Sequence, residues 1–248
     1  MDITQDGEQL FLTKVILKDF GFHYQLCTKE SLWKKGNDPC RLCLHCEVRA
    51  QTEIFPRPTL WALPSPVVAK GADVTLRCQG QLGSDRFQLW KDGELREERN
   101  DSWSQADFVL RKVDDERDAR SYRCRSGKGP LWSEYSEPLA LMVTGAFSTP
   151  NIGTSPGPLI SPGKTVTIWC QIPEQSPTQD CSFALLDAKS LEPLLLQIPA
   201  GLRTEFSLPS VRAKDTGSYR CIYYKKTPPH RASHPSPVVE LTVLGDCS

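Results

Sequence analysis

The residues best suited to chemistry lie near the amino terminus, where cysteine recurs at every third position. Cys40, Cys43 and Cys46 form two consecutive Cys-x-x-Cys steps, and Cys27 precedes them. Thiolates at this spacing can hold zinc, but a closed zinc site uses two such steps about fifteen residues apart, and only one dense run is present. We therefore expect no metal here. The alternatives that remain are unstable structure, sequence foreign to the mature protein, and disulfides to other domains.

Histidine, the usual general base, is scarce and badly placed for catalysis. No histidine lies between residues 46 and 229, so a Ser-His-Asp arrangement cannot be assembled across most of the chain. His230 and His234 are four residues apart, but the neighbouring prolines exclude the helix that would align them as a metal pair. No glycine-rich phosphate loop is present. These observations predict that the chain is not an enzyme, has no catalytic residues and uses no cofactor.

Four other cysteines form two long-range pairs, Cys78 with Cys124 and Cys170 with Cys221, at nearly equal separations. Such regular pairs predict disulfides and an oxidising compartment. Cys181 and Cys247 are left over. We expect them at opposite ends of one domain, about 20 Å apart, which is too far for a disulfide between them.

The two pairs belong to an internal repeat that covers residues 64–144 and 156–243. Val74-Thr-Leu-Arg-Cys78 recurs as Val166-Thr-Ile-Trp-Cys170, and Ser121-Tyr-Arg-Cys124 recurs as Ser218-Tyr-Arg-Cys221. Apolar and polar residues alternate in these segments, and turn residues separate them every eight to twelve positions, which is typical of antiparallel strands. The repeat predicts an all-β chain of two tandem immunoglobulin-like β-sandwiches of the C2 type.

Details of the repeat support this fold. Tyr122 and Tyr219 lie two residues before the second cysteine of each unit, the tyrosine-corner position of an immunoglobulin sandwich. The tryptophan usual on the third strand is missing, and we expect phenylalanine or leucine to fill its place. The predicted boundaries are 1–54 for a poorly structured amino-terminal segment, 55–145 for domain 1, 146–245 for domain 2 and 246–248 for a tail.

Several motifs resemble one group of immunoglobulin-like domains. They are Phe87-Gln-Leu-Trp-Lys-Asp-Gly93, Tyr122-Arg-Cys-Arg-Ser-Gly127 and Trp132-Ser-Glu-Tyr-Ser-Glu-Pro-Leu139. Over residues 55–245 the sequence is similar to the immunoglobulin-like domains of the leukocyte receptor complex and of alpha-1B-glycoprotein. The resemblance implies an extracellular protein that binds a protein ligand. Within this group, the motifs resemble those of alpha-1B-glycoprotein most. The alternative is an ectodomain of a leukocyte immune receptor. The Trp-Ser motif becomes Ala232-Ser233 in the second unit, so we expect its role only in domain 1.

Charge and hydropathy limit the partners and the location. Thirty basic and thirty acidic residues cancel, so we expect neither nucleic acid nor an anionic membrane as a partner. No apolar run is long enough to span a membrane, and the acidic start does not resemble a signal peptide. We expect an extracellular protein, secreted or on the cell surface, whose given start reflects a fragment or a mispredicted first exon.

Ligand contacts are expected on the loops that follow the second cysteine of each unit. The candidate residues are Arg125 and Lys128 in domain 1, and Lys225, Lys226, His230 and Arg231 in domain 2. Asn100 begins an Asn-x-Ser sequon and is expected to lie between strands, exposed and glycosylated. Residues 143–147 are expected to form a short linker. Met142 and Phe147 are expected to be buried between the domains, which would form a fixed elbow.

Overall fold

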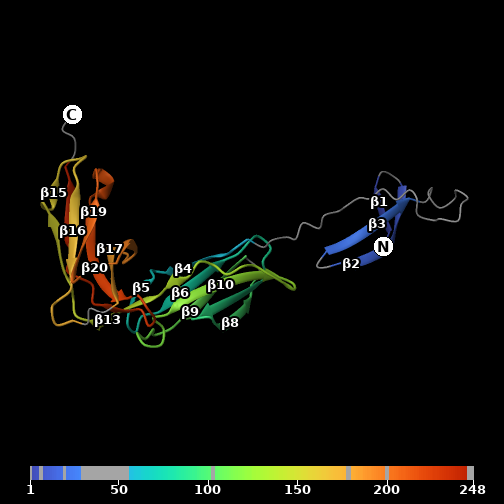
Figure 1. The fold of residues 1–248 in the computed structure, drawn as a ribbon, viewed down its shortest axis with the longest axis horizontal. Coiled ribbons are helices and arrows are strands. Elements are labelled where there is room, and N and C mark those ends of the chain that lie inside the picture. The colour runs from blue at the N-terminus through green and yellow to red at the C-terminus, as the bar shows by residue number, and fades with distance from the viewer. Residues whose placement is uncertain are drawn as a thin grey trace, which may run out of the picture. The chain divides into compact units, whose positions relative to one another are not determined.

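The computed structural model describes residues 2–5, 8–18 and 21–28 as strands, and residues 56–101, 104–176, 180–198 and 201–244 in full (Figure 1). The chain divides into two compact units, Met1–Ile54 and Phe55–Ser248. The second unit contains both sandwiches.

The amino-terminal unit contains a three-stranded antiparallel sheet of β1 (Asp2–Gln5), β2 (Glu8–Lys18) and β3 (Gly21–Thr28). The sequence predicts a poorly structured segment over residues 1–54, and its described residues, 2–5, 8–18 and 21–28, form these three strands. Valine, isoleucine, phenylalanine and tyrosine are frequent in β2 and β3 and favour extended backbone. Apolar residues also stand next to one another in these strands, so the sequence shows no clear alternation of apolar and polar residues. Cys27 lies opposite Phe11. Cys40, Cys43 and Cys46 lie outside the described residues, and the absence of a stable core in residues 1–54 stays a prediction.

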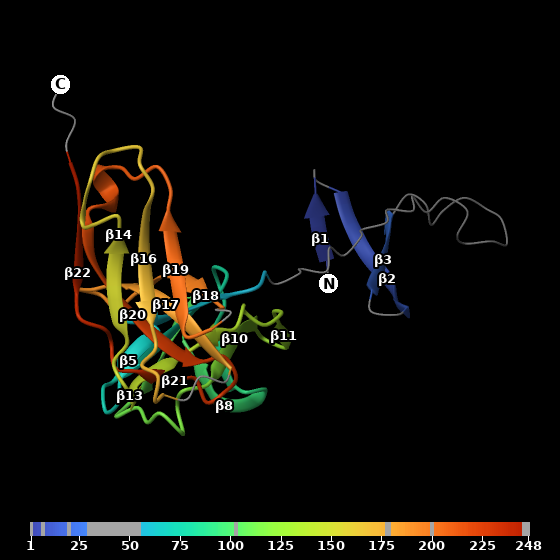
Figure 2. The same cartoon turned by 60° about the vertical axis from the view of Figure 1, so that its left-hand side comes forward.

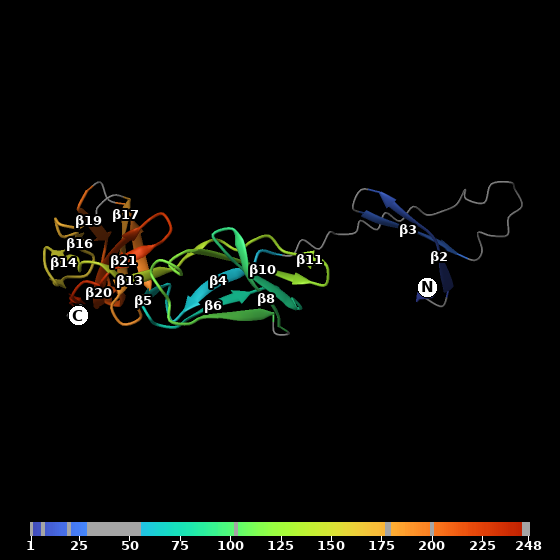
Figure 3. The same ribbon diagram turned by 90° about the horizontal axis from the view of Figure 1, so that it is seen from below.

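Domain 1 is a sandwich of two antiparallel sheets, which can be followed in Figure 3. Alternate side chains of β6 are buried because they face the other sheet. Leu76 and Phe108 of the first sheet and Phe87 of the second are fully enclosed between them. The first sheet consists of β4 (Thr59–Leu63), β6 (Val74–Gln79) and β9 (Gln105–Leu110). The second consists of β11 (Leu131–Trp132), β10 (Ser121–Lys128), β7 (Arg86–Lys91) and β8 (Glu94–Asn100), with β12 (Leu139–Ala140) on β10.

Domain 2 repeats this plan. Three of its strands, β14 (Asn151–Ser155), β16 (Val166–Gln171) and β19 (Arg203–Leu208), lie side by side in Figure 2. The other sheet contains β18 (Pro193–Gln197), β17 (Cys181–Asp187), β20 (Gly217–Lys225), β22 (Val239–Val243) and β15 (Leu159–Ile160), and a short 3₁₀ helix, η2 (Ala213–Asp215), precedes β20. In both domains the fourth main strand, β8 or β18, extends the sheet that carries the second cysteine, as in the C2 type.

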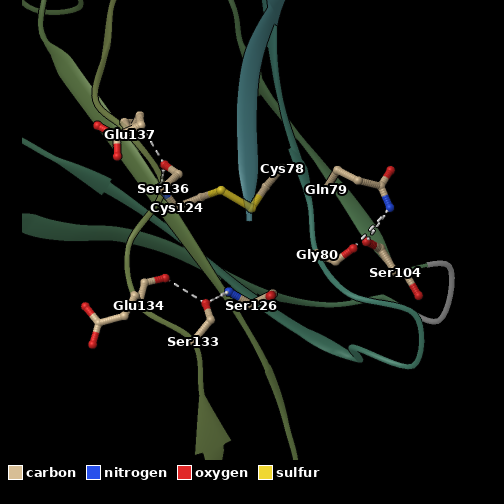
Figure 4. Close-up of a disulfide and its surroundings, with 10 residues drawn as sticks. All are labelled: Cys78, Gln79, Gly80, Ser104, Cys124, Ser126, Ser133, Glu134, Ser136 and Glu137. Carbon is tan, nitrogen blue, oxygen red and sulfur yellow. Dashed lines mark hydrogen bonds between the residues drawn. A yellow bond between two sulfur atoms is a disulfide. The ribbon is translucent and has the colours of Figure 1, made fainter. Parts of the chain in front are cut away.

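Disulfides join Cys78 to Cys124, shown in Figure 4, and Cys170 to Cys221. These are the two pairs that the repeat predicts. The phenol of Tyr122 donates to the carbonyl of Asp118 at 3.1 Å, and that of Tyr219 donates to the carbonyl of Asp215 at 2.7 Å. Both bonds close the turn into the strand of the second cysteine. The place of the missing tryptophan is filled by fully buried phenylalanine and leucine: Phe87, Leu89, Phe183 and Leu185.

The expected linker is instead part of a strand. β13 (Met142–Phe147) runs parallel to β5 (Val67–Ala69) of domain 1 and continues parallel to β21 (Arg231–Ser233) of domain 2. The prediction of a linker over residues 143–147 is therefore wrong. Gly145, near the middle of β13, has a φ of 100°, a backbone conformation that favours glycine, and the register with β21 shifts between Val143 and Phe147. The sheet of domain 2 thus reaches β5 without interruption.

Candidate functional site

The two sandwiches meet in an apolar contact that we call the junction. Ala184, Leu186, Ile222 and Ala232 of domain 2 are fully buried in one cluster with Val67 and Met142 of domain 1. Met142 therefore occupies the place expected for it. Phe147 does not: its ring stacks on Tyr223 at 5.9 Å, against the core of domain 2.

A charged cluster lies beside the junction. Asp115 of domain 1 accepts hydrogen bonds from Lys70 Nζ at 2.6 Å and from Arg231 Nε of domain 2 at 2.8 Å, and only 4% of its side chain is exposed. Burial alone would raise the pKa of this carboxyl. The hydrogen bond from Lys70 and the charge of Arg231 oppose burial, and the pKa of Asp115 is lowered overall. Asp115 therefore joins the two domains as an ionised carboxylate.

His230 is buried beside this cluster. Its Nδ1 lies 3.0 Å from the carbonyl of Lys225 and its Nε2 lies 3.0 Å from the hydroxyl of Ser121 in domain 1. Its backbone N–H donates to the carbonyl of Ala119. We expected His230 and Arg231 on an exposed contact loop; the structure places both against domain 1, because the buried acceptors there take up their donors. Lys226 remains exposed and Lys225 is half-buried.

The junction face of domain 2 has a counterpart in domain 1. Counted from the shared phenylalanine, Phe183 or Phe87, Ala184 corresponds to Gln88 and Leu186 corresponds to Trp90. Counted from the second cysteine, Cys221 or Cys124, Ile222 corresponds to Arg125. Counted from the motif serine, Ser233 or Ser133, Ala232 corresponds to Trp132. In domain 2 these four positions are buried by domain 1. In domain 1 Trp90, Arg125 and Trp132 are half-exposed, and Gln88 lies beneath them.

We call this half-exposed surface of domain 1 the platform; it comprises Arg86, Trp90, Arg125, Trp132 and Tyr135, together with Gln88 buried beneath them. The guanidinium of Arg125 lies 4.7 Å from the ring centre of Trp132, 5.3 Å from that of Trp90 and 5.5 Å from that of Tyr135. Arg86 covers Trp132 at 4.6 Å, and the rings of Trp90 and Tyr135 meet edge to face. Such cation–π stacking holds long side chains in one arrangement.

Hydrogen bonds fix the platform from below. The Gln88 carbonyl oxygen accepts from Arg125 Nε at 2.7 Å and from Trp90 Nε1 at 3.2 Å, while its amide donates to Glu98 at 2.6 Å. Glu98 also accepts from Arg86. The bond from Gln88, followed by that from Arg86, lowers the pKa of Glu98, so this carboxylate stays charged. A groove of about 540 Å³ beside the platform is lined by residues that include Trp90, Arg123 and Tyr135.

The serines of the Trp-Ser motif act in both domains, which corrects our expectation for the second. Ser136 and Ser133 accept from the backbone N–H groups of Cys124 and Ser126 (Figure 4). Ser236 and Ser233 accept from those of Cys221 and Tyr223 in the same way. These hydroxyls accept hydrogen bonds from buried backbone N–H groups of the strand that carries the second cysteine, at places where the next segment is not a regular strand. Only the tryptophan is specific to domain 1.

The remaining candidate residues are scattered. Arg125 belongs to the platform, whereas Lys128 is exposed at the end of β10. Asn100 is exposed but ends β8 rather than lying between strands, and it pairs with Arg86. Cys181 begins β17, where burial raises the pKa of its thiol. Cys247 lies outside the described residues.

Sequence reasoning missed Gln88, Trp90 and Glu98. The signal that could have found them is the alternation of Arg86, Gln88 and Trp90 on one face of a strand, opposite Arg125. Among the described residues, no group of three or more histidine, cysteine or acidic side chains could hold a metal ion. No helix in the described part of the chain is long and apolar enough to cross a membrane.

Two disulfide-stapled C2-type sandwiches define an immunoglobulin-like protein. No family model matches the chain. Immunoglobulin superfamily member 1 of rat is 34% identical over 207 residues, which are 82% of this chain and 15% of that protein. Human leukocyte immunoglobulin-like receptor subfamily B member 4 is 33% identical over 82% of this chain and 47% of its own length. Rat natural cytotoxicity triggering receptor 1 is 32% identical over 83% of this chain and 62% of its own length.

The solved human OSCAR ligand-binding domain is 33% identical, covers 75% of this chain, is itself covered over 99% and has a TM-score of 0.40. On its sequence identity to the three curated relatives, the chain belongs to the leukocyte-receptor family of immunoglobulin-like domains. It is an extracellular or cell-surface ectodomain. The chain spans 15%, 47% and 62% of the length of the three curated relatives named above.

Proposed function

We propose that this chain recognises a protein ligand and that the platform of domain 1 is the contact surface. One observation carries this proposal. The repeat uses the same sheet face twice, and the copy in domain 2 is fully buried as a protein interface, whereas the copy in domain 1 is open. A face that is already an interface in one domain is a good candidate for one in the other.

The chemistry of the platform supports a protein partner. Tryptophan, tyrosine and arginine are the residues most enriched among those that dominate binding energy at protein interfaces. Their stacking and the bonds to Gln88 hold them in place before a ligand arrives, so binding loses less side-chain entropy. The groove lined by Trp90, Arg123 and Tyr135 offers a recess beside these rings for an anchoring side chain.

The kind of protein remains a choice between two. A secreted plasma protein similar to alpha-1B-glycoprotein was expected from the motifs. The relatives named above favour the alternative, the ectodomain of a leukocyte immune receptor, because two of them are receptors. The complete transcript distinguishes the two: a membrane-spanning segment or cytoplasmic tyrosine motifs encoded beyond Ser248 would identify a receptor.

The test of the contact surface uses an array of purified extracellular protein domains, probed with the whole chain. Arg125→Ala and Trp90→Ala should each weaken capture of a bound partner by about tenfold or more. Arg203→Ala is the matched control, because Arg203 stacks on Trp169 in domain 2 at 4.8 Å. A partner that binds the two platform variants as tightly as the wild type would refute the platform as the contact surface.

A further inference from the structure

The second open surface of the chain is the outer edge of β18. This strand pairs with β17 through Pro193, Leu195, Leu196 and Gln197, and no strand in the described residues pairs with its other edge. An edge strand presents a row of backbone N–H and C=O groups to any chain that can pair with it.

Natural edges are usually protected by charge, and domain 1 shows this protection. Its edge strand β8 carries five charged residues, Glu94, Arg96, Glu97, Glu98 and Arg99, while β18 carries none. The two strands can be matched directly because the register of each ladder shifts at the same place, after Leu89 in one and after Leu185 in the other. Glu98 lies opposite Gln88, and Leu196 lies opposite the corresponding Ala184.

At the matched positions, the charged residues of β8 are replaced by leucine in β18. Where β8 has Glu97 and Glu98, β18 has Leu195 and Leu196. Leu194, Leu195, Leu196 and Ile198 are exposed by 48, 38, 61 and 66% of their surface. Exposed apolar residues on both faces of an uncharged edge strand are the combination that folded monomers avoid.

This apolar edge continues the junction. Leu196 lies on the same face as Ala184, which is buried in the junction cluster. A groove of about 520 Å³ connects the two. Its lining includes Met142 of domain 1 and Leu196 and Tyr224 of domain 2, with Arg57 and Glu137 of domain 1 as its charged members. The open leucines are thus an extension of a surface that the molecule already uses as an interface.

We propose that β18 pairs antiparallel with β18 of a second copy of this chain. A two-fold axis through the middle of the strand places like residues of the two copies near each other, which an uncharged strand allows and a strand such as β8 would resist. The exposed fractions of these four apolar residues correspond to on the order of 400 Å² in each copy. The pair, with its backbone edges and part of the groove, approaches the roughly 1,000 Å² of a weak specific interface.

Sedimentation velocity of the whole chain, at concentrations from about 1 to 300 µM, tests this pairing. The wild type should shift from monomer to dimer with concentration. Leu196→Glu and the pair Leu195→Glu with Leu196→Glu, which restore the charges of β8, should weaken dimerisation by about tenfold or more. The matched control is Leu159→Glu, since Leu159 is equally exposed, at 60%, on β15 of the same domain.

Two checks keep the result specific. Non-reducing gels must show that the dimer is not covalent, and circular dichroism melting must show that each variant folds. Leu196→Ala, which keeps the backbone edge but removes part of the apolar surface, should dimerise more weakly than the wild type and more tightly than Leu196→Glu. A monomeric wild type at every concentration would overturn the proposal, as would a dimer that tolerates both glutamate variants.

Discussion

The carboxylate of Asp115 in domain 1 lies 2.8 Å from the guanidinium Nε of Arg231 in domain 2. The two residues are 116 positions apart, yet the carboxylate is almost completely enclosed and is also bound by Lys70. The elbow between the sandwiches is therefore held by a buried ion pair, which we call the polar lock, in addition to its apolar contact. The polar lock consists of Asp115, Arg231 and Lys70.

Breaking this lock should loosen the elbow. Asp115→Ala removes the shared acceptor and leaves two cations near each other, so we expect an increase in the maximum dimension measured by small-angle scattering of the whole chain. Both disulfides should remain intact by peptide mapping. The control is Glu205→Ala, which removes the partner of Arg203 in an exposed pair within domain 2. Scattering curves that coincide for Asp115→Ala and the wild type would show that the apolar contact alone fixes the elbow.

Acid should destabilise domain 1 before domain 2. Asp107, Asp114, Asp115 and Asp118 of domain 1 have pKa values below the ordinary range, whereas Asp187 is the one such aspartate among the described residues of domain 2. A carboxyl with a lowered pKa in the folded state contributes stability that is complete above its unfolded pKa, near 4, and is lost as the pH falls further. Pepsin digestion between pH 4 and 2 should cleave within residues 56–141 first. Earlier cleavage in domain 2 would contradict this order.

Phe147→Asp should destabilise domain 2 rather than only loosen the elbow. The ring of Phe147 stacks on Tyr223 and packs against the core of domain 2, so an aspartate there places a charge against buried apolar surface. We expect a loss of about 2 kcal/mol or more in the free energy of unfolding of domain 2, measured by urea denaturation. Substitution of Ser148, the next residue, by aspartate is the control at an exposed position.

Gln88→Leu should disorder the platform without unfolding domain 1. The leucine keeps the volume of the side chain but removes the acceptor shared by Arg125 and Trp90 and the donor to Glu98. Tryptophan fluorescence should shift and the near-ultraviolet circular dichroism should weaken, while the far-ultraviolet spectrum stays unchanged. Gln79→Leu is the control on β6, because Gln79 bonds only to backbone carbonyls there. Unchanged near-ultraviolet spectra would show that stacking alone orders the platform.

A glycan on Asn100 should lie at the edge of the sheet that carries the platform, because Asn100 is exposed and pairs with Arg86. When the chain is secreted from mammalian cells, treatment with a peptide N-glycosidase should reduce its mass by one glycan. Asn100→Gln should remove the same mass. A secreted wild type with no change in mass on treatment would disprove occupancy.

The repeated features could be predicted from the sequence, and the features that differ between the repeats could not. The two disulfides, both tyrosine corners and the strands beside them depend on local motifs that appear twice. His230 and Arg231 were expected in an exposed loop because proline and lysine surround them, but their positions depend on hydrogen-bond partners more than a hundred residues away. The exposure of β18 could not be predicted either, because a run of leucines in a sequence indicates burial.

The crossing strand β13 has a consequence for how the chain can be divided. Any boundary placed between Met142 and Phe147 cuts a strand that pairs with β5 on one side and with β21 on the other. A separately expressed domain 1 would lose the end of this strand, and a separately expressed domain 2 would lose its beginning. The smallest piece of this chain that can be transplanted into another protein with every strand whole is therefore the pair of sandwiches.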